Sequence, residues 1–160
     1  MEPKIVEIKE KKLIGMRTSL SLSNDTTREL WQQFMPRRKE IINPLDNGFF
    51  SMKIYDDNLE IKNFTPQTVF EKWAAIEVSD ISQIPEGMES HVLSGGKYAL
   101  FIHKGPASTF SQTLQFIFET WLPNSQYELD NREHFEIMQE NYHPNDPDAE
   151  EEVWIPITHF

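Results

Sequence analysis

The 160-residue sequence contains no cysteine. This absence excludes disulfide frameworks, thiolate nucleophiles and cysteine-ligated metal sites. Long hydrophobic runs are missing too, because the apolar runs extend over a few residues, whereas a membrane-spanning helix needs about 20. The first residues do not form a signal-peptide pattern. We therefore expect a cytoplasmic protein that has no membrane partner.

Positive charge is scarce. Lysine and arginine number 15 against 26 aspartates and glutamates, which gives a net charge of −11. A grip on the phosphate backbone of nucleic acid needs clustered cations, so we expect no direct binding of nucleic acid. The segment from Glu128 to Glu152 holds ten carboxylates and only Arg132 as a cation. This acidic third predicts either a solvated surface or an acidic site.

Known catalytic motifs are also missing. The sequence has no G-x-S-x-G elbow, no P-loop and no dinucleotide fingerprint, and its five histidines lack metal-binding spacing. We therefore expect no metal and no cofactor, and no motif favours an enzyme. The chain has 38% hydrophobic and 12% aromatic residues, which suffices for one hydrophobic core. We expect a single domain over residues 1–160.

The periodicity of apolar and polar residues, in segments bounded by turn residues, predicts seven strands and two helices. Capping boxes at 26–29 and 109–112 predict the two helix starts. The pair Gly95-Gly96 predicts a hairpin turn, and the first two strands are expected to be neighbours. The predicted strands are Ile5–Ile8, Leu13–Leu22, Phe49–Tyr55, Phe70–Val78, Lys97–His103, His134–Gln139 and Val153–Ile157.

The order of elements occurs twice. Thr26 and Thr109, which open the two capping boxes, are 83 residues apart, and the same separation relates Ile54 to Ile137 in the strands that follow. Halves of this size are too small to be separate domains. We therefore expect an α+β fold in which half-repeats of about 1–82 and 83–160 pack as one pseudo-twofold unit.

Strand alternation sorts the side chains into two faces. We expect the more aliphatic set of each strand to face the helices, which leaves a second face of mixed aromatic and acidic character. Aromatic rings attract cations, and a partly desolvated carboxylate pairs with a positive guest, so this face predicts a site for a flat or greasy cation. Alternatively, the tryptophans are packing residues and the glutamates are solvated. The face holds Tyr55, Trp73, Glu77, Glu136, Met138, Glu152 and Trp154.

Six segments carry a resemblance to a known family, namely Leu30–Pro36, Phe70–Val78, Gly96–Gly105, Trp121–Pro123, His134–Met138 and Glu152–Ile157. Together they resemble the GyrI-like small-molecule-binding domain, which is also the effector-binding domain of AraC-type and MerR-type transcription regulators. The resemblance covers nearly the whole chain. It implies a duplicated βαββ-type module, an antiparallel sheet with helices on one side and a ligand cleft between the halves.

Members of the family typically place a glutamate in an aromatic cavity. The matching position here is Glu136, with Trp73, Glu77, Tyr55 and Trp154 as walls, and with Met138, Glu152 and Phe101 as further candidates. Family members fused to a helix-turn-helix regulate transcription. The first predicted strand of this chain begins by about Lys4, so we expect no such domain in it.

The resemblance and the residues together favour a stand-alone module that senses or sequesters amphipathic, cationic small molecules, in some link to transcription regulation through a separate regulator. A first alternative is an inhibitory protein that binds DNA gyrase, since an acidic domain competes for a basic surface. A second alternative is a hydrolase of strained electrophilic natural products, in which Glu136 is the general base or an electrostatic stabiliser, provided that burial raises its pKa.

Overall fold

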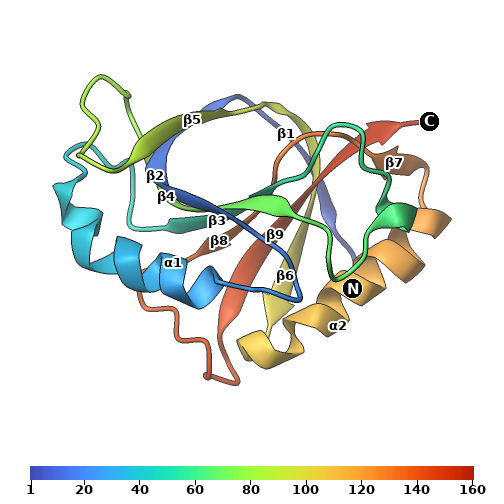
Figure 1. The fold of residues 1–160 in the computed structure, drawn as a ribbon. Coiled ribbons are helices and arrows are strands. Elements are labelled where there is room, and N and C mark those ends of the chain that lie inside the picture. Colours follow the sequence, from blue (N-terminus) through green and yellow to red (C-terminus); the bar gives the residue numbers. More distant parts are fainter.

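A computed structural model describes all residues 1–160 and shows an α+β fold built on one large antiparallel sheet. Nine strands form the sheet in the order β1-β6-β9-β8-β3-β4-β2-β5, and β7 pairs with β9. Both main helices lie on the same side of this sheet (Figure 1). The strands are β1 (Lys4–Ile8), β2 (Lys11–Leu20), β3 (Phe49–Ile54), β4 (Phe70–Val78), β5 (Glu89–Leu93), β6 (Gly96–Lys104), β7 (Tyr127–Leu129), β8 (His134–Met138) and β9 (Glu150–His159).

The helices are short. The first, α1 (Thr27–Phe34), continues as a 3₁₀ turn over Met35–Glu40. The second, α2 (Phe110–Phe116), follows a 3₁₀ turn over Ala107–Thr109 and continues as a π-helical turn and a 3₁₀ turn as far as Asn124. A further 3₁₀ turn spans Ile61–Asn63. None of these helices combines the length and the apolar character that crossing a membrane requires.

The two helix starts agree with the prediction, but the capping boxes do not form. Neither Thr26 nor Thr109 makes a side-chain cap. Instead, Asp25 Oδ1 accepts hydrogen bonds from the backbone N–H and the hydroxyl of Thr27, at 2.9 and 2.6 Å. The hydroxyl of Thr109 donates to the carbonyl of Pro106. A carboxylate or a carbonyl close by is a strong local partner, and it replaces the predicted reciprocal bonds.

The sheet shows the expected duplication. Its centre is the pair β3 and β8, where Met52 lies opposite Phe135, and these two residues are 83 positions apart. On either side of this centre β4 corresponds to β9 and β2 corresponds to β6. The halves therefore meet at a pseudo-twofold axis between the central strands, as the 83-residue offset predicts.

The edge strands correct two predictions. β1 pairs with β6 of the second half, and β5 pairs with β2 of the first half, so each half contributes the edge strand of the other half. The first two strands are therefore not neighbours, and the turn at Gly95-Gly96 is not a hairpin, although Gly96 does have a positive φ of 135°. Connection length alone favours local pairing, whereas these strands complete the exposed edge of the opposite half.

A hydrophobic core lies on the face of the sheet away from the helices. The sheet curls (Figure 1), and side chains from β2 to β6, β8 and β9 meet inside the curl. The rings of Phe50, Phe135 and Trp154 stack in a row with centroid separations of 5.4 Å. Tyr98 packs edge-on against Phe135. We call this cluster the inner core; its buried members are Leu13, Phe50, Met52, Trp73, Ala75, Leu93, Tyr98, Phe135 and Trp154.

On the helix side, each helix covers the outer strands of one half. Leu30 and Phe34 of α1 pack on Ala74 and Ile76 of β4. Beneath the second helix, Ile117 packs on strands β6 and β9. The expectation that the aliphatic set faces the helices is therefore correct for β4 and β9.

The same expectation is wrong for the central strands β3 and β8. Phe50, Met52 and Phe135 belong to the inner core, so the alternate residues Lys53 and Glu136 are on the helix side. The reason is that no helix runs over the middle of the central strands; α1 reaches only Phe49, at the start of β3. Phe50, Met52 and Phe135 are therefore buried inside the curl, while Lys53 and Glu136 face the space between the helices.

Phe135 tests the importance of the inner core. Its side chain is fully buried, and replacing such a phenylalanine by alanine costs about 3–5 kcal/mol. We expect Phe135→Ala to lower the free energy of unfolding by that amount in urea titrations. Phe160→Ala, at a terminal side chain that is 82% exposed, should leave it unchanged. A loss below about 1 kcal/mol for Phe135→Ala would show that the stack is not a structural centre.

Candidate ligand-binding site

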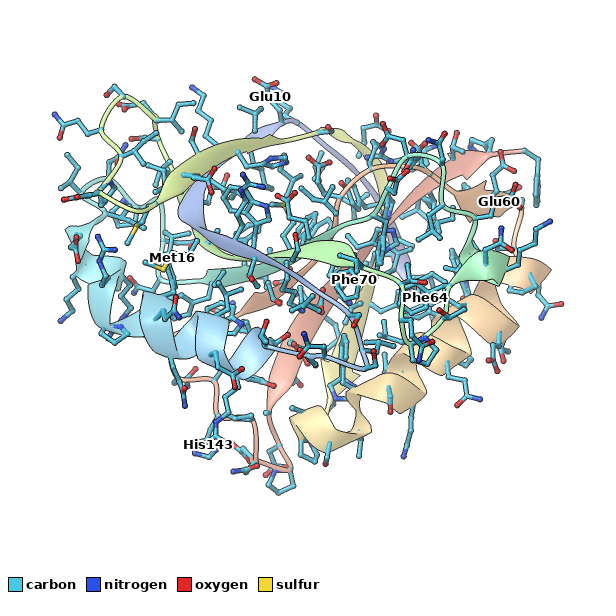
Figure 2. All side chains as sticks on the ribbon, in the orientation of Figure 1. Glu10, Met16, Glu60, Phe64, Phe70 and His143 are labelled. Carbon is cyan, nitrogen blue, oxygen red and sulfur yellow. The ribbon has the colours of Figure 1, made fainter.

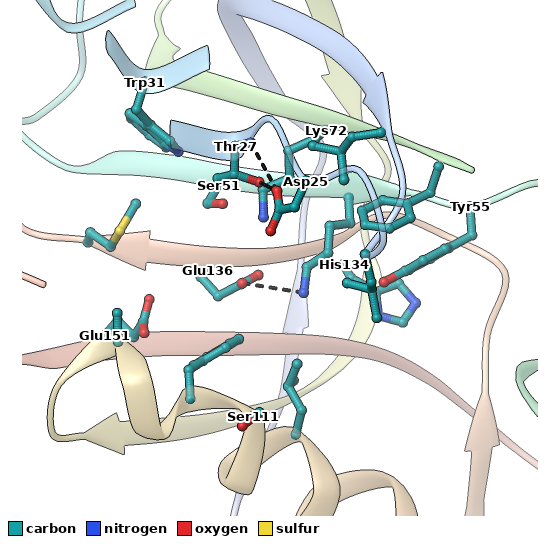
Figure 3. A pocket seen from close by; sticks show the side chains of 18 of the residues that line it. Asp25, Thr27, Trp31, Ser51, Tyr55, Lys72, Ser111, His134, Glu136 and Glu151 are labelled. Carbon is teal, nitrogen blue, oxygen red and sulfur yellow. Dashed lines mark hydrogen bonds and ion pairs between the residues drawn. The ribbon is translucent and has the colours of Figure 1, made fainter. Parts of the chain in front are cut away.

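A large cavity lies between the two helices, over the central strands. Its volume is about 1270 Å³, which exceeds the usual range of about 300–1,000 Å³ for small-molecule sites. Strands β3, β4, β8 and β9 form the floor, and the two helices and the segments after β3 and β8 form the walls (Figure 3).

The walls are largely aromatic. Trp31 from α1 packs edge-on against Phe49, with ring centroids 6.2 Å apart. On the opposite side Tyr55 packs against Phe64 and Phe70, at 5.9 and 5.1 Å. Figure 2 shows these two phenylalanines beside each other; Phe64 lies within the segment that leads from β3 to β4, and Phe70 is the first residue of β4. The second helix contributes Phe110, Leu114 and Phe118.

An ion pair lies on the floor. Lys53 Nζ is 3.4 Å from Glu136 Oε1, and the two side chains are only 12% and 7% exposed (Figure 3). The ammonium also lies 5.7 Å from the centre of the Phe110 ring. Burial is the largest single influence and lowers the pKa of Lys53, but Glu136, Tyr55 and Glu151 together raise this pKa above its usual value. Lys53 is therefore a permanent cation inside the cavity.

A second lysine follows on the next strand. Lys72 of β4 is the cross-strand partner of Lys53, and its ammonium has no carboxylate within ion-pair distance. Burial, together with the positive charge of Lys53, lowers the pKa of Lys72 to about 8. On the other side of Lys53, burial lowers the pKa of His134 to about 3, with Lys53 as the second cause, so this imidazole is neutral.

A second carboxyl group lies at the far end of the floor. Glu151 of β9 is 8% exposed and is opposite Met138 of β8. Burial raises the pKa of Glu151 to about 7, and repulsion from Glu136 adds to this. The Glu151 carboxyl is not in an ion pair. Of the two glutamates on the floor, Glu136 is thus paired and Glu151 is half protonated near neutral pH.

Three of the sequence-predicted site residues line this cavity, namely Glu136, Tyr55 and Met138. The others lie elsewhere, so the expectation that all share one face is wrong. Trp73 and Trp154 are buried in the inner core. Phe101 is buried beneath the second helix, against Trp121.

The two remaining glutamates are on the opposite face of the sheet. Glu77 pairs with Lys11 at 3.5 Å, and Glu152 accepts a hydrogen bond from Trp154 Nε1 at 2.9 Å. The packing interpretation of the tryptophans is therefore the correct one. The error arose because the prediction assigned the two faces of β3 and β8 the wrong way round. It therefore grouped Glu136 with the tryptophans, whose side chains lie on the other face of the sheet.

The sequence did contain a signal for the missed lysine. Lys53 and Glu136 are 83 residues apart, so they are equivalent positions of the duplication. A twofold axis between adjacent antiparallel strands brings such positions together, and the opposite charges predict an ion pair. The alternation of β4 also carried a signal for Lys72, because this residue is in phase with Ala74 and Ile76, which face α1. Glu151 carried no such signal, because it precedes the predicted strand Val153–Ile157.

The comparisons with known proteins agree on the fold. The C-terminal domain of EcmrR superposes with a TM-score of 0.72 at 15% identity, over 99% of this chain and 98% of that one. SAV2435 in its complex with tetraphenylphosphonium superposes with a TM-score of 0.70 at 15% identity, over 99% and 94%.

A curated relative has higher sequence identity. The transcriptional regulator BrlR of Pseudomonas aeruginosa is 30% identical over 158 residues. This alignment covers 98% of the chain and 56% of BrlR, so the chain spans little more than half the length of the regulator. The model of the GyrI-like small molecule binding domain matches residues 1–158. With a match over almost its whole length, the chain belongs to the family of GyrI-like small molecule binding domains.

Proposed function

We propose that the cavity binds amphipathic, cationic small molecules and that the chain acts as an effector-binding module, by sensing or by sequestration. The observation that carries the proposal is the cavity itself, in which aromatic walls surround the two carboxyl groups of Glu136 and Glu151. Aromatic faces attract a cation through the ring quadrupole, and a carboxylate in a partly desolvated site adds charge pairing.

Two similar proteins support this proposal. One structural neighbour holds tetraphenylphosphonium, a greasy organic cation. The curated relative is a transcriptional regulator, which favours an effector role. The internal ion pair sets a condition, because a cation that uses Glu136 must share this carboxylate with Lys53. Glu151 has no such competitor and is the carboxyl group that a cation reaches without displacing another charge.

Glu136→Gln tests the charge of the floor. The exchange keeps the shape and leaves Lys53 unpaired, so it should weaken tetraphenylphosphonium binding by roughly 2–5 kcal/mol, the range for truncating a buried charge pair. The binding of neutral triphenylphosphine oxide should weaken much less. Glu152→Gln, on the opposite face, is the matched control and should change neither affinity. The measurement is calorimetric titration, and equal losses for both ligands would assign Glu136 a structural role.

The pKa of Glu151 predicts a pH dependence. Below pH 7 this carboxyl is mostly protonated and neutral, and above pH 7 it is an anion that attracts a cation. The affinity for tetraphenylphosphonium should therefore rise about ten-fold from pH 6 to pH 8, because the ionised fraction rises by about that factor.

Lys72 acts in the same direction, since with a pKa of about 8 it loses its positive charge as the pH rises further. Glu151→Gln should abolish the rise in tetraphenylphosphonium affinity near pH 7 and leave the rise near pH 8. Triphenylphosphine oxide provides a pH-independent reference. An unchanged pH profile in Glu151→Gln would exclude Glu151 as a contact of the cation.

Lys53→Met removes the internal competitor for Glu136. At pH 8 we expect it to tighten tetraphenylphosphonium binding about ten-fold, because Glu136 then has no other cation nearby. Lys104→Met, at an exposed residue of β6, should have no effect. Weaker binding in Lys53→Met, with the fold intact by circular dichroism, would show that the ion pair organises the site instead of competing with the ligand.

A further inference from the structure

The cavity contains an ammonium group that the binding of a cation does not use. Lys72 lines the cavity beside Lys53, but only Lys53 has a carboxylate partner. Asp25 and Glu136 lie close enough to favour the charged form of Lys72 but are not in ion-pair contact with it. Of the two Asp25 oxygens, Oδ1 accepts both hydrogen bonds from Thr27. A partly buried ammonium without a partner carries a desolvation cost that an incoming anion would offset.

Strand register places the charges of the floor in order. Lys72, Lys53 and His134 form one row across β4, β3 and β8. Glu136 is two residues further along β8, and Glu151 is opposite Met138, four residues further along. At about 3.3 Å per residue, the carboxyl positions are roughly 7 and 13 Å from the basic row along the strand direction. The floor therefore has a positive end at Lys72 and an acidic end at Glu151.

The positive end is also apolar. Phe70 is two residues before Lys72 on the same face of β4, and its cross-strand partner is Leu20. Both residues line the cavity. An ammonium set among such side chains suits an anion that is attached to a greasy body better than a small hydrated ion, because apolar burial and charge pairing then act together.

We propose that Lys72 forms an anion subsite, so that the cavity also accepts amphipathic molecules with a carboxylate, a sulfonate or a similar anionic group. The subsite uses the cavity of the proposed function but requires no cationic group on the ligand. A ligand that carries both charges would lie along the floor with its anion at Lys72 and its cation at Glu151. The cavity then selects a ligand by the sign of the charge at each of the ligand's two ends.

Two probes of nearly equal shape and opposite charge test the subsite, namely tetraphenylborate and tetraphenylphosphonium. Their binding is measured by calorimetric titration in potassium-free buffer at pH 7, where Lys72 is mostly charged. We expect tetraphenylborate to bind the wild type and to bind Lys72→Met at least ten-fold more weakly. Tetraphenylphosphonium should bind Lys72→Met as tightly as the wild type or more tightly.

Two further variants separate charge from structure. Lys72→Arg keeps the positive charge and should retain tetraphenylborate binding, and Lys104→Met should change neither affinity. If Lys72→Met fails to fold, Lys72→Gln replaces it, with the same expected loss.

The outcomes separate the two proposals. If tetraphenylphosphonium binds and tetraphenylborate does not, the subsite is refuted and the proposed function stands. Equal losses of both probes in Lys72→Met, or no loss of tetraphenylborate, also refute the subsite. If neither probe binds the wild type, both proposals are refuted.

Discussion

Two short helices cannot cover a sheet of this width, and most of the site follows from this constraint. A helix with its side chains is about 10–12 Å wide and neighbouring strands are about 4.8 Å apart, so a helix covers about two strands, and each main helix packs on the outer strands of one half. No helix runs over the middle of the central strands β3 and β8, and α1 reaches only Phe49 at the start of β3. Phe50, Met52 and Phe135 are buried inside the curl of the sheet, and the helix side of these strands forms the floor of a cavity that contains the charged residues Lys53 and Glu136.

Much of the fold could be predicted from the sequence, because strand alternation, the helix starts and the 83-residue offset are local or periodic features. The partners of the edge strands could not, since β1 and β5 pair with the distant half. The site was predicted in part. Alternation separates Lys53, Tyr55 and Glu136 from their neighbours, but it does not say which set faces the helices, and the rule that serves Ala74 and Val153 fails where no helix covers the strand.

The charge state of each group in the cavity depends on whether it has a partner of opposite charge. Lys53 and Glu136 satisfy each other, and such a buried pair contributes little net stability while restricting which guests can enter. Burial shifts the pKa of each remaining group in the direction that disfavours its charged form. It lowers the pKa of Lys72, raises the pKa of Glu151 and keeps His134 neutral. The cavity is therefore less acidic than the net charge of the chain suggests.

The twofold centre at Met52 and Phe135 has a consequence for how such a site can arise. In a dimer of identical halves, the residues at positions 53 and 136 would be the same, and two lysines or two glutamates would repel each other across the axis. A covalent duplication removes this identity, because each copy mutates independently. Opposite charges at equivalent positions are thus available to a duplicated chain and not to a symmetric homodimer of its half.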